Sequence, residues 1–251
     1  EFGTLAHSLN KMAEKFKTDN RQLQLLNKKQ NQFFADIAHE VRNPLHTISG
    51  AVEMIQMEGL SEDKKQQYLH TVQKQVERVV RLFNDIKMLQ RYDLDEHFLT
   101  KTEFVVSDFI EQLIESYRPL AEEKNIQMDL QLLDDGMMYA DKDKIDQVLD
   151  NLITNAIKYT NQGTITVGVQ KEGSALCISV KDTGIGIAEE HLEHLFDRFY
   201  RTDKARSRDK GGMGLGLAVV RSILQAHNTD ILVSSIPSEG STFYFYLPEH
   251  T

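Results

Sequence analysis

The segment HEVRNPL, residues 39–45, brings an ionisable pair, His39 and Glu40, close to a proline inside an otherwise helical pattern. A free imidazole has a pKa of about 6.5, so much of it is neutral at neutral pH, and histidine can form covalent intermediates. Glu40 could take or orient an imidazole proton, and the Asn43 amide lies on the same helical face as His39. Pro44 cannot donate to the Glu40 carbonyl, so the helix can bend beside the histidine. A nucleophilic histidine is one interpretation, and an ordinary solvated surface histidine is the alternative.

A second polar group lies on one face of a predicted helix within DQVLDNLITNAIKYT, residues 146–160. Asn151, Asn155, Lys158 and Tyr159 are spaced so that they share that face. Two amides and a lysine on one face suit a hydrated Mg²⁺ with its phosphates. A polar solvated face is the alternative interpretation of this motif alone.

Glycines mark a third motif, DTGIGI, residues 182–187, directly after an apolar strand. Gly184 and Gly186 would let the backbone approach a flat ligand closely. Asp182 can accept a hydrogen bond from an exocyclic amine. An ordinary strand-to-helix turn is the alternative for so short a motif.

A fourth motif, GGMGLGLA, residues 211–218, opens a predicted helix. Glycines at a helix N-terminus expose backbone N–H groups that bind anions. The motif matches neither the P-loop pattern nor the Rossmann fingerprint, and the protein-kinase catalytic motifs are absent from the sequence. The charged segment RTDKARSRDK, residues 201–210, is predicted to be a mobile loop that could close over a nucleotide.

The first third of the chain supplies the helices that would carry His39. Apolar residues at alternating steps of three and four, interrupted at Asp19 and Gln30, predict a coiled coil: Leu5, Leu9, Met12, Phe16, Leu23, Leu26, Phe33 and Ile37. A turn at EGLSED, residues 58–63, precedes a second helix whose stripe is Leu69, Val72, Val76, Val79, Phe83 and Ile86. His39 falls on the side away from the seam. A lone hairpin buries both stripes poorly, so the pattern predicts a homodimeric four-helix bundle.

From about residue 101 helices and strands mix. Strands are predicted at 104–106, 126–133, 164–170, 175–182, 230–236 and 241–248. Helices are predicted from Ser107, which can cap the first of them, to about 123, from Asp141 to 159, over 188–200 and from about 215. This order predicts an α/β sandwich with helices over one face of a mixed sheet.

The bulk composition limits the class of protein. The chain has 251 residues and a formal charge of −9, which argues against non-specific binding to nucleic acid. Its single cysteine, Cys177, excludes an internal disulfide and suits a reducing compartment. No run of apolar residues is long enough to span a bilayer, and no secretory signal opens the sequence.

Taken together, the order and spacing of these motifs resemble those of the sensor histidine kinases of two-component signalling. FADIAHEVRNPL is similar to their H box, DQVLDNLITNAIKYT to the N box, DTGIGI and GGMGLGLA to the two glycine boxes, and FDRFYR to the F box. The resemblance implies an α + α/β chain, in which an antiparallel hairpin forming a dimeric four-helix bundle precedes an α/β sandwich of the GHKL or Bergerat ATP-binding fold. EFGTLAHSLNKMAEKF is similar to the end of a HAMP linker, which implies the cytoplasmic portion of a membrane receptor.

The resemblance also implies domains. Residues 1–30 would be the HAMP end and signalling helix, 31–95 the dimerisation and histidine phosphotransfer domain, and 101–251 the catalytic ATP-binding domain. It implies ATP and Mg²⁺ as cofactors, with a homodimer partner and the receiver domain of a response regulator.

The resemblance further implies roles for individual residues. His39 would be the phosphoacceptor, Glu40 its base or orienting group, and Asn43 the residue that orients water for dephosphorylating the regulator. Asn155 would coordinate Mg²⁺, and Asp182 would bind the adenine amine. The remaining nucleotide residues would be Asn151, Lys158, Tyr159, Gly184, Gly186, Arg201, Gly212, Gly214, Leu215 and Gly216.

Other interpretations are kept open. ATPases of the gyrase, mismatch-repair and heat-shock chaperone types share the fold but lack an upstream histidine hairpin. A non-catalytic or phosphatase-only scaffold of the same fold and a protein-serine kinase are further alternatives. The sequence departs from the family at Asn43, where Thr is commoner, at AHNTD, residues 226–230, and at IPSEGSTF, residues 236–243.

Overall fold

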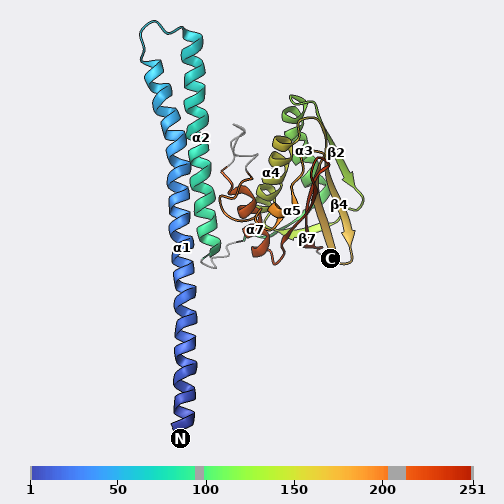
Figure 1. Ribbon diagram of the computed structural model, residues 1–251. Helices are drawn as coiled ribbons and strands as arrows, with labels where there is room; N and C mark the ends of the chain where they lie inside the picture. The colour runs from blue at the N-terminus through green and yellow to red at the C-terminus, as the bar shows by residue number, and fades with distance from the viewer. Residues whose placement is uncertain (1, 94–98, 203–212, 250–251) are drawn as a thin grey trace. The chain divides into compact units, whose positions relative to one another are not determined.

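The structure, a computed structural model, describes residues 2–93, 99–202 and 213–249 (Figure 1). The chain divides into two compact units, residues 1–81 and 82–251, and each is described by itself. Within the described ranges, no helix has both the length and the apolar character needed to cross a membrane.

The first unit is a helical hairpin, formed by α1 (Phe2–Ile55) and the larger part of α2 (Glu62–Asp93). The predicted turn at residues 58–63 joins them, and Gly59 there adopts a φ of 84°, which suits a residue without a Cβ. The helix α1 continues through Pro44, whose side chain is buried. The hairpin that the sequence predicts is confirmed.

The predicted seam of the hairpin divides into a covered stripe and an exposed one. Of the predicted α2 stripe, Val72 and Val79 are half-buried and Ile86 is buried. Three residues outside that stripe are half-buried at the same spacing of three and four: Lys65, Tyr68 and Gln75. Beside them Leu69, Val76 and Phe83 stay exposed, as do Leu45 and Val52 on α1. One hairpin therefore leaves part of its apolar surface in contact with water.

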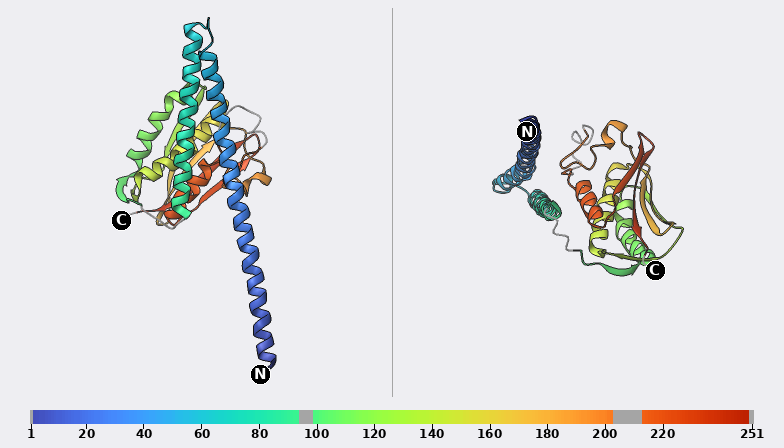
Figure 2. Two further views of the ribbon diagram at one scale, coloured as in Figure 1. Left: turned by 90° about the vertical axis from the view of Figure 1, so that its left-hand side faces the viewer. Right: turned by 90° about the horizontal axis from the view of Figure 1, so that it is seen from below.

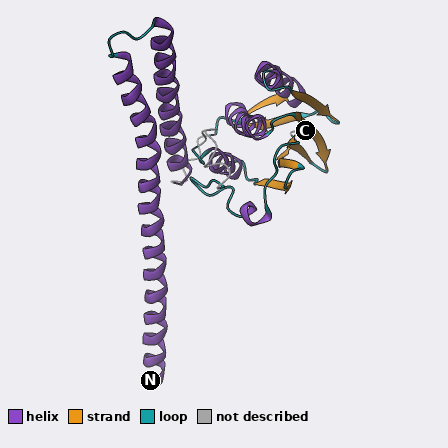
Figure 3. Cartoon of the chain, turned by 45° about the horizontal axis from the view of Figure 1, so that its top comes forward, coloured by secondary structure: helices purple, strands orange, loops and turns teal. Residues whose placement is uncertain are grey.

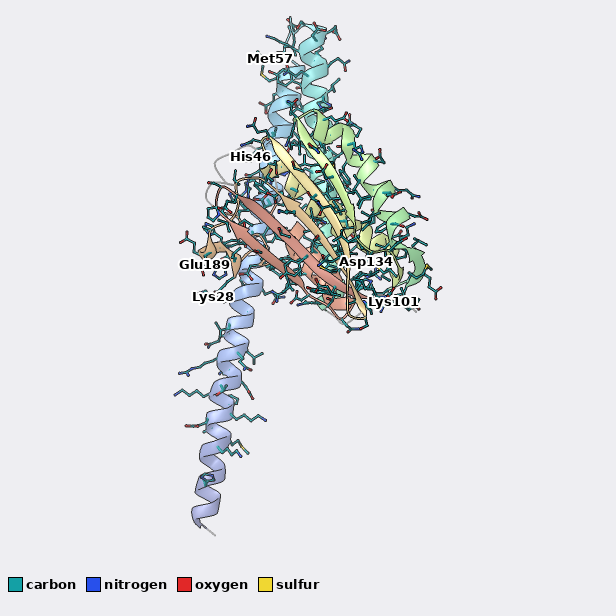
Figure 4. The ribbon with its side chains drawn as sticks, turned by 90° about the vertical axis from the view of Figure 1, so that its right-hand side faces the viewer. Lys28, His46, Met57, Lys101, Asp134 and Glu189 are labelled. Carbon is teal, nitrogen blue, oxygen red and sulfur yellow. The ribbon has the colours of Figure 1, made fainter. Side chains whose placement is uncertain are left out.

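The N-terminal part of α1 exposes its side chains to solvent. Every side chain from residue 11 to residue 25 is exposed, and Figure 4 shows such side chains projecting from the helix below the labelled Lys28. Met12, Phe16 and Leu23 of the predicted coiled-coil seam are among them. The stretch is helical as predicted, and the coiled coil itself stays a prediction.

The second unit is an α/β sandwich built on a five-stranded sheet of order β2-β4-β5-β7-β6. The strands are β2 (Ile126–Leu132), β4 (Gly163–Glu172), β5 (Ala175–Asp182), β7 (Gly240–Pro248) and β6 (Ile231–Ile236). β2 pairs with β4 in parallel and the remaining pairs are antiparallel, so the sheet is mixed as predicted. A separate ribbon pairs β1 (Thr102–Val105) with β3 (Met137–Ala140), and the sequence analysis did not predict β3.

Helices cover one face of this sheet (Figures 2 and 3). They are α3 (Val106–Glu122), α4 (Lys142–Tyr159) and α7 (Gly216–Ala226). Alternate strand residues point under them and are fully buried, including Ile165 and Val167 of β4 and Ile178 and Val180 of β5. The sandwich predicted from the order of the elements is confirmed.

Two local predictions are wrong. The helix expected over residues 188–200 shrinks to α5 (Glu189–Leu192). The chain then continues in single turns, such as Asp197 N–H to His194 O, and Phe199 takes a φ of 62° while its N–H donates to Gly214 O at 2.8 Å. The hydrogen bond to Gly214 therefore fixes a non-helical backbone at Phe199, although the spacing of the apolar residues predicted that the helix would continue.

The second wrong prediction concerns the start of α3. Ser107 does not cap the helix, which begins at Val106. Instead the Asp135 carboxylate accepts from the Ser107 hydroxyl at 2.8 Å and from the Ser107 N–H at 3.2 Å. A carboxylate from a distant loop therefore satisfies the N-terminal backbone donor that a local side chain was expected to serve.

Candidate functional site

The His39 imidazole lies exposed on α1, as its position relative to the seam predicts. Its Nδ1 lies 3.4 Å from the Asn43 Nδ2, so the expected sharing of one helical face by these two residues is confirmed. An exposed imidazole with one nitrogen beside an amide keeps its other nitrogen open to a reacting group.

The Glu40 side chain is hydrogen-bonded to the neighbouring helix α2. Its carboxylate accepts from the Arg78 guanidinium of α2, with 3.1 Å between Oε2 and Nη2, and both side chains are largely buried. The Arg78 Nε is buried without a partner among the described residues. Sequence reasoning missed Arg78, because nothing in the local pattern of α2 signals a partner 38 residues away.

In the second unit, α4 carries four of the predicted nucleotide residues. The helix begins where the sequence predicts, at Asp141, whose side chain caps it by accepting from the Lys144 N–H. Seven apolar residues of α4 are buried, which leaves Asn151, Asn155, Lys158 and Tyr159 half-buried on another face. The Lys158 ammonium lies 4.7 Å from the centre of the Tyr159 ring.

Asp182, the last residue of β5, is buried, with only 6% of its surface exposed. Its Oδ1 accepts from the Gly184 N–H at 2.8 Å. Burial raises the pKa of this carboxyl, and hydrogen bonds from the backbone of Gly184 and Ser241 oppose that rise. A buried acceptor of this kind suits an uncharged donor such as an aromatic amine.

At both glycines of DTGIGI, neighbouring atoms lie too close to leave room for a Cβ. A Cβ on Gly184 would lie 2.6 Å from the Tyr159 carbonyl oxygen and 2.7 Å from Asp182 Oδ1. Gly186 has a φ of 64°, and a Cβ there would collide with the carbonyl of Ile236 in β6. The motif thus connects the end of α4 to the β6–β7 hairpin.

The second glycine motif packs against the F-box segment, residues 196–201. Gly214 has a φ of 73°, and a Cβ on it would lie 2.7 Å from the Phe199 carbonyl carbon. Leu215 is fully buried and precedes α7, and its carbonyl accepts from the Val219 N–H. Gly216, the first residue of α7, packs so closely on the Asn151 amide that a Cβ would overlap its Oδ1.

The structure therefore brings together two groups of predicted residues. Tyr159, Asp182 and Gly184 form one, and Asn151 with Gly216 forms the other. Arg201 is half-buried at the end of a described range. Gly212 and residues 203–210 of the expected mobile loop lie outside the described residues, and His39, Glu40 and Asn43 belong to the other unit.

Thr160 is a residue of this site that sequence reasoning missed. It follows Tyr159 directly, is fully buried, and its hydroxyl lies against Gly184. Among the described residues no cluster of three or more histidine, cysteine or acidic side chains could hold a metal ion. A divalent ion here would depend on amide oxygens, water and a ligand's own phosphates.

Two known families match this chain. Residues 29–94 match the His Kinase A (phospho-acceptor) domain, and residues 140–251 match the family described as Histidine kinase-, DNA gyrase B-, and HSP90-like ATPase. The sensor histidine kinase WalK of Bacillus subtilis is 38% identical over 230 residues, which are 89% of this chain and 37% of that protein. YclK of the same organism is 32% identical over 249 residues, 99% of this chain and 53% of that protein. The chain thus spans about a third to a half of these relatives.

Solved structures agree with this assignment of the fold. The histidine kinase AdeS of Acinetobacter baumannii has a TM-score of 0.69 at 25% identity, covering 85% of this chain and 98% of that one. The histidine kinase ThkA, solved in complex with the response regulator protein TrrA, has a TM-score of 0.70 at 26% identity, covering 87% of this chain and 61% of that one.

Proposed function

Because the chain belongs to the sensor histidine kinases of two-component systems, we propose that it phosphorylates its own His39 from Mg-ATP. The phosphoryl group then passes to an aspartate on the receiver domain of a response regulator. The observation that carries the proposal is the exposed imidazole of His39 within the phospho-acceptor match, on a chain whose second unit holds the buried Asp182 between close-packed glycines.

The second unit would bind the nucleotide. Asp182 accepts a hydrogen bond from the adenine amine, while Gly184 and Gly186 allow the flat base to approach the backbone. Lys158 and Arg201 balance phosphate charge, Asn151 lies on the phosphate side and Tyr159 packs beside the nucleotide. The second glycine motif, Gly212 to Gly216 with Leu215 as its buried anchor, shapes the phosphate end of the pocket.

A magnesium ion fits the residues available. Asn155 is half-buried on the same face of α4 as Asn151, and an amide oxygen is a hard ligand of the kind Mg²⁺ takes up beside water and phosphate. When bound, the ion neutralises charge on the phosphates and orients the γ-phosphoryl group for transfer. The chain's own contribution is to hold the amide in place on a helix packed against the sheet.

The transfer is a displacement at phosphorus. A ring nitrogen of His39 with a free lone pair attacks the γ-phosphorus, the bond to the β,γ-bridging oxygen breaks, and ADP leaves with that electron pair. The imidazole loses its proton from the other nitrogen to a base. Glu40 is the adjacent carboxylate in the chain, and to act as this base it would exchange its bond with Arg78 for one with the imidazole. Catalysis in such a step comes mainly from positioning and charge neutralisation.

A homodimer completes the first unit. The exposed apolar residues of the hairpin, Leu45 and Val52 on α1 and Leu69, Val76 and Phe83 on α2, would be buried by a second copy in a four-helix bundle. The exposed seam of residues 11–25 would pair as a coiled coil and carry the input signal. We assign residues 1–30 to this signalling segment, 31–95 to dimerisation and phosphotransfer, and 101–251 to ATP binding.

The partner would be a receiver domain, as in the ThkA complex with a response regulator protein. Asn43, beside the phosphoacceptor, would orient the water that dephosphorylates that regulator.

The test is incubation with Mg²⁺ and γ-labelled ATP, comparing the unmodified chain with His39→Gln. The proposal expects label that is acid-labile, alkali-stable and absent from the variant. Label that survives acid would indicate a hydroxyl acceptor, and nucleotide binding without label would indicate a scaffold.

A further inference from the structure

A single hydrogen bond holds the ion pair between Arg78 and Glu40. The Arg78 Nη2 lies 3.1 Å from the Glu40 Oε2, while the Arg78 Nε is buried and has no hydrogen-bond partner among the described residues. A guanidinium and a carboxylate form their strongest pair through two parallel hydrogen bonds. This pair uses one of them and leaves a buried donor unsatisfied, which costs free energy. It is therefore weaker than a two-bond pair and can be broken at a moderate cost.

The environment of the pair limits which partner can replace Arg78. Both side chains are largely buried, so water reaches the Glu40 carboxylate poorly. A shielded carboxylate that loses its cation is strongly disfavoured unless another polar group binds it. The adjacent side chain on α1 is His39, whose imidazole is exposed and can donate a hydrogen bond through a ring N–H. The imidazole is therefore an available second partner for this carboxylate.

The imidazole itself is held only loosely by its neighbour. The Asn43 Nδ2 lies 3.4 Å from the His39 Nδ1, which is longer than the usual range of about 2.7–3.2 Å between donor and acceptor. An exposed ring with one long contact can rotate to take a new partner. The restraint on proton transfer therefore lies with the Glu40 carboxylate and its bond to Arg78, and not with the imidazole.

A change of rotamer separates the two positions of the carboxylate. Consecutive residues of an α-helix are about 100° apart around its axis, so a Glu40 side chain turned toward α2 points away from the His39 ring. The side chain has staggered minima about its rotatable bonds, and rotation about them swings the carboxylate from one side to the other without moving the backbone. Breaking the bond to Arg78 is the part of this change that costs free energy.

We propose that Arg78 is a positioning residue for phosphoryl transfer, which holds the Glu40 carboxylate on α2 until its release allows that carboxylate to take the proton of His39. In that step a ring N–H bond breaks and an O–H bond forms on Glu40. Because the partners lie on different helices, a displacement of α1 relative to α2 would lengthen their bond and free the carboxylate. The inference rests on the proposed function, in which His39 is the phosphoacceptor and Glu40 its base.

The experiment measures the initial rate of His39 labelling by γ-labelled ATP at saturating Mg-ATP, with the full 251-residue chain. A set of variants weakens the bond to Glu40 by different amounts: Arg78→Met removes every donor, Arg78→Gln keeps an uncharged donor, and Arg78→Lys keeps a charged one. The rates should decrease in the order Met, Gln, Lys, with the lysine variant within about twofold of the unmodified chain. The methionine variant should label about 10-fold faster than the unmodified chain, which corresponds to one hydrogen bond of about 1.4 kcal/mol.

Further controls separate positioning from a change in fold or in nucleotide binding. The ATP concentration for half-maximal labelling should be the same in all variants, because the proposed nucleotide residues lie in the other unit. Arg81→Gln, at an exposed position on the same helix, should label at the unmodified rate. In a Glu40→Gln background, Arg78→Met should cause no acceleration, because the side chain on which Arg78 acts can no longer take a proton.

An acceleration that persists in the Glu40→Gln background would show that Arg78→Met acts by loosening the hairpin, and it would overturn the inference. Unchanged or slower labelling by a folded methionine variant would overturn it too. Should that variant fail to fold by circular dichroism, the glutamine and lysine variants decide, because equal rates for these two contradict the inference. An unmodified chain that gives no acid-labile label would overturn the proposed function itself.

Discussion

The Glu40 carboxylate is bound to Arg78 on the neighbouring helix, at 3.1 Å, and not to the imidazole of His39 beside it in the chain. Both members of the pair are mostly shielded from solvent, with 26% of the Arg78 and 16% of the Glu40 side chain exposed. Breaking one partner of a shielded pair leaves the other charge without compensation. The pair therefore joins the two helices next to the phosphoacceptor.

Replacing Arg78 with Gln should lower the stability of the hairpin by about 1–2 kcal/mol, because Glu40 then loses a charge-assisted hydrogen bond while staying shielded. Circular dichroism melts at one protein concentration measure the effect. Arg81→Gln is the matched control, since Arg81 lies exposed on the same helix. Equal melting curves for the two variants would mean that the pair contributes nothing to stability.

Replacing Glu40 with Gln tests whether this carboxylate is the base. The amide oxygen can still accept from Arg78, so the hairpin should stay folded, while the ability to take a proton is lost. We expect His39 to be labelled about 100-fold more slowly, with ADP affinity unchanged because the nucleotide residues lie in the other unit. A labelling rate like that of the unmodified chain would exclude Glu40 as the base.

Pro44 lies buried within the continuous helix α1, one turn beyond Glu40. Pro44→Ala restores a backbone donor to the Glu40 carbonyl and should stiffen the helix below His39. If bending there controls access to the histidine, the ratio of kinase to regulator-phosphatase activity should change. Gly50→Ala, which also stiffens α1 and meets no atom within 4 Å, is the control. An unchanged ratio in the proline variant would contradict the hinge.

Gly214 and Gly173 form a matched pair for testing the contact with the F-box segment. Both have positive φ angles, 73° and 65°, but a Cβ on Gly214 would press on Phe199 whereas one on Gly173 would meet nothing within 4 Å. Gly173→Ala should cost about 1–2 kcal/mol in stability and leave ADP affinity unchanged. Gly214→Ala should in addition weaken ADP binding, by about 10-fold if one contact of 1.4 kcal/mol is lost, because it separates Phe199 from the start of α7. Equal ADP affinities would show that this contact does not shape the pocket.

The sequence predicted those features that local chemistry controls. Asp141 at the start of α4, the alternation in β4 and β5, and the facing of His39 away from the seam all follow from periodicity and capping. The shared face of Asn151 and Asn155 follows from the same helical spacing.

The failures concern contacts between distant segments. Phe199 leaves the helical region because of Gly214, Ser107 takes its partner from Asp135, and Glu40 takes its partner from Arg78. No local pattern encodes such partners. Thr160 was missed for a similar reason, since its hydroxyl gains significance only from Gly184 and Asp182, which follow more than twenty residues later.

His227 should make the stability of the second unit depend on pH. The residue is 5% exposed at the end of α7. Its Nδ1–H donates to the Ile223 carbonyl at 2.8 Å, and its Nε2 accepts from the Asp141 N–H at 3.2 Å. The bond from the Asp141 N–H requires an unprotonated Nε2 and hence the neutral ring, whereas the bond to Ile223 can form in either state of the ring. The Asp141 carboxylate in turn accepts from the Thr100 N–H at 2.8 Å. His227 therefore helps to position the residue that binds the backbone of Thr100.

The direction of this pH dependence follows from the shift in the pKa of His227. Burial lowers the pKa of His227, with Lys101 acting in the same direction and the Ile223 carbonyl and Asp141 opposing it. The unfolded chain therefore binds a proton at a higher pH than the folded one, so stability falls as pH drops below the unfolded value of about 6.5 and stops falling below the lowered folded pKa.

Thermal melts between pH 5 and pH 8 on the unmodified chain and on His227→Gln measure this dependence. Gln can donate to Ile223 and accept from Asp141 without titrating, so its Tm should fall less on the acid side than that of the unmodified chain. His46→Gln, at an exposed position on α1 (Figure 4), should keep the original slope. Since only a buried neutral ring gains a proton on unfolding in this range, parallel curves for the unmodified chain and His227→Gln would mean that the ring is already charged in the fold.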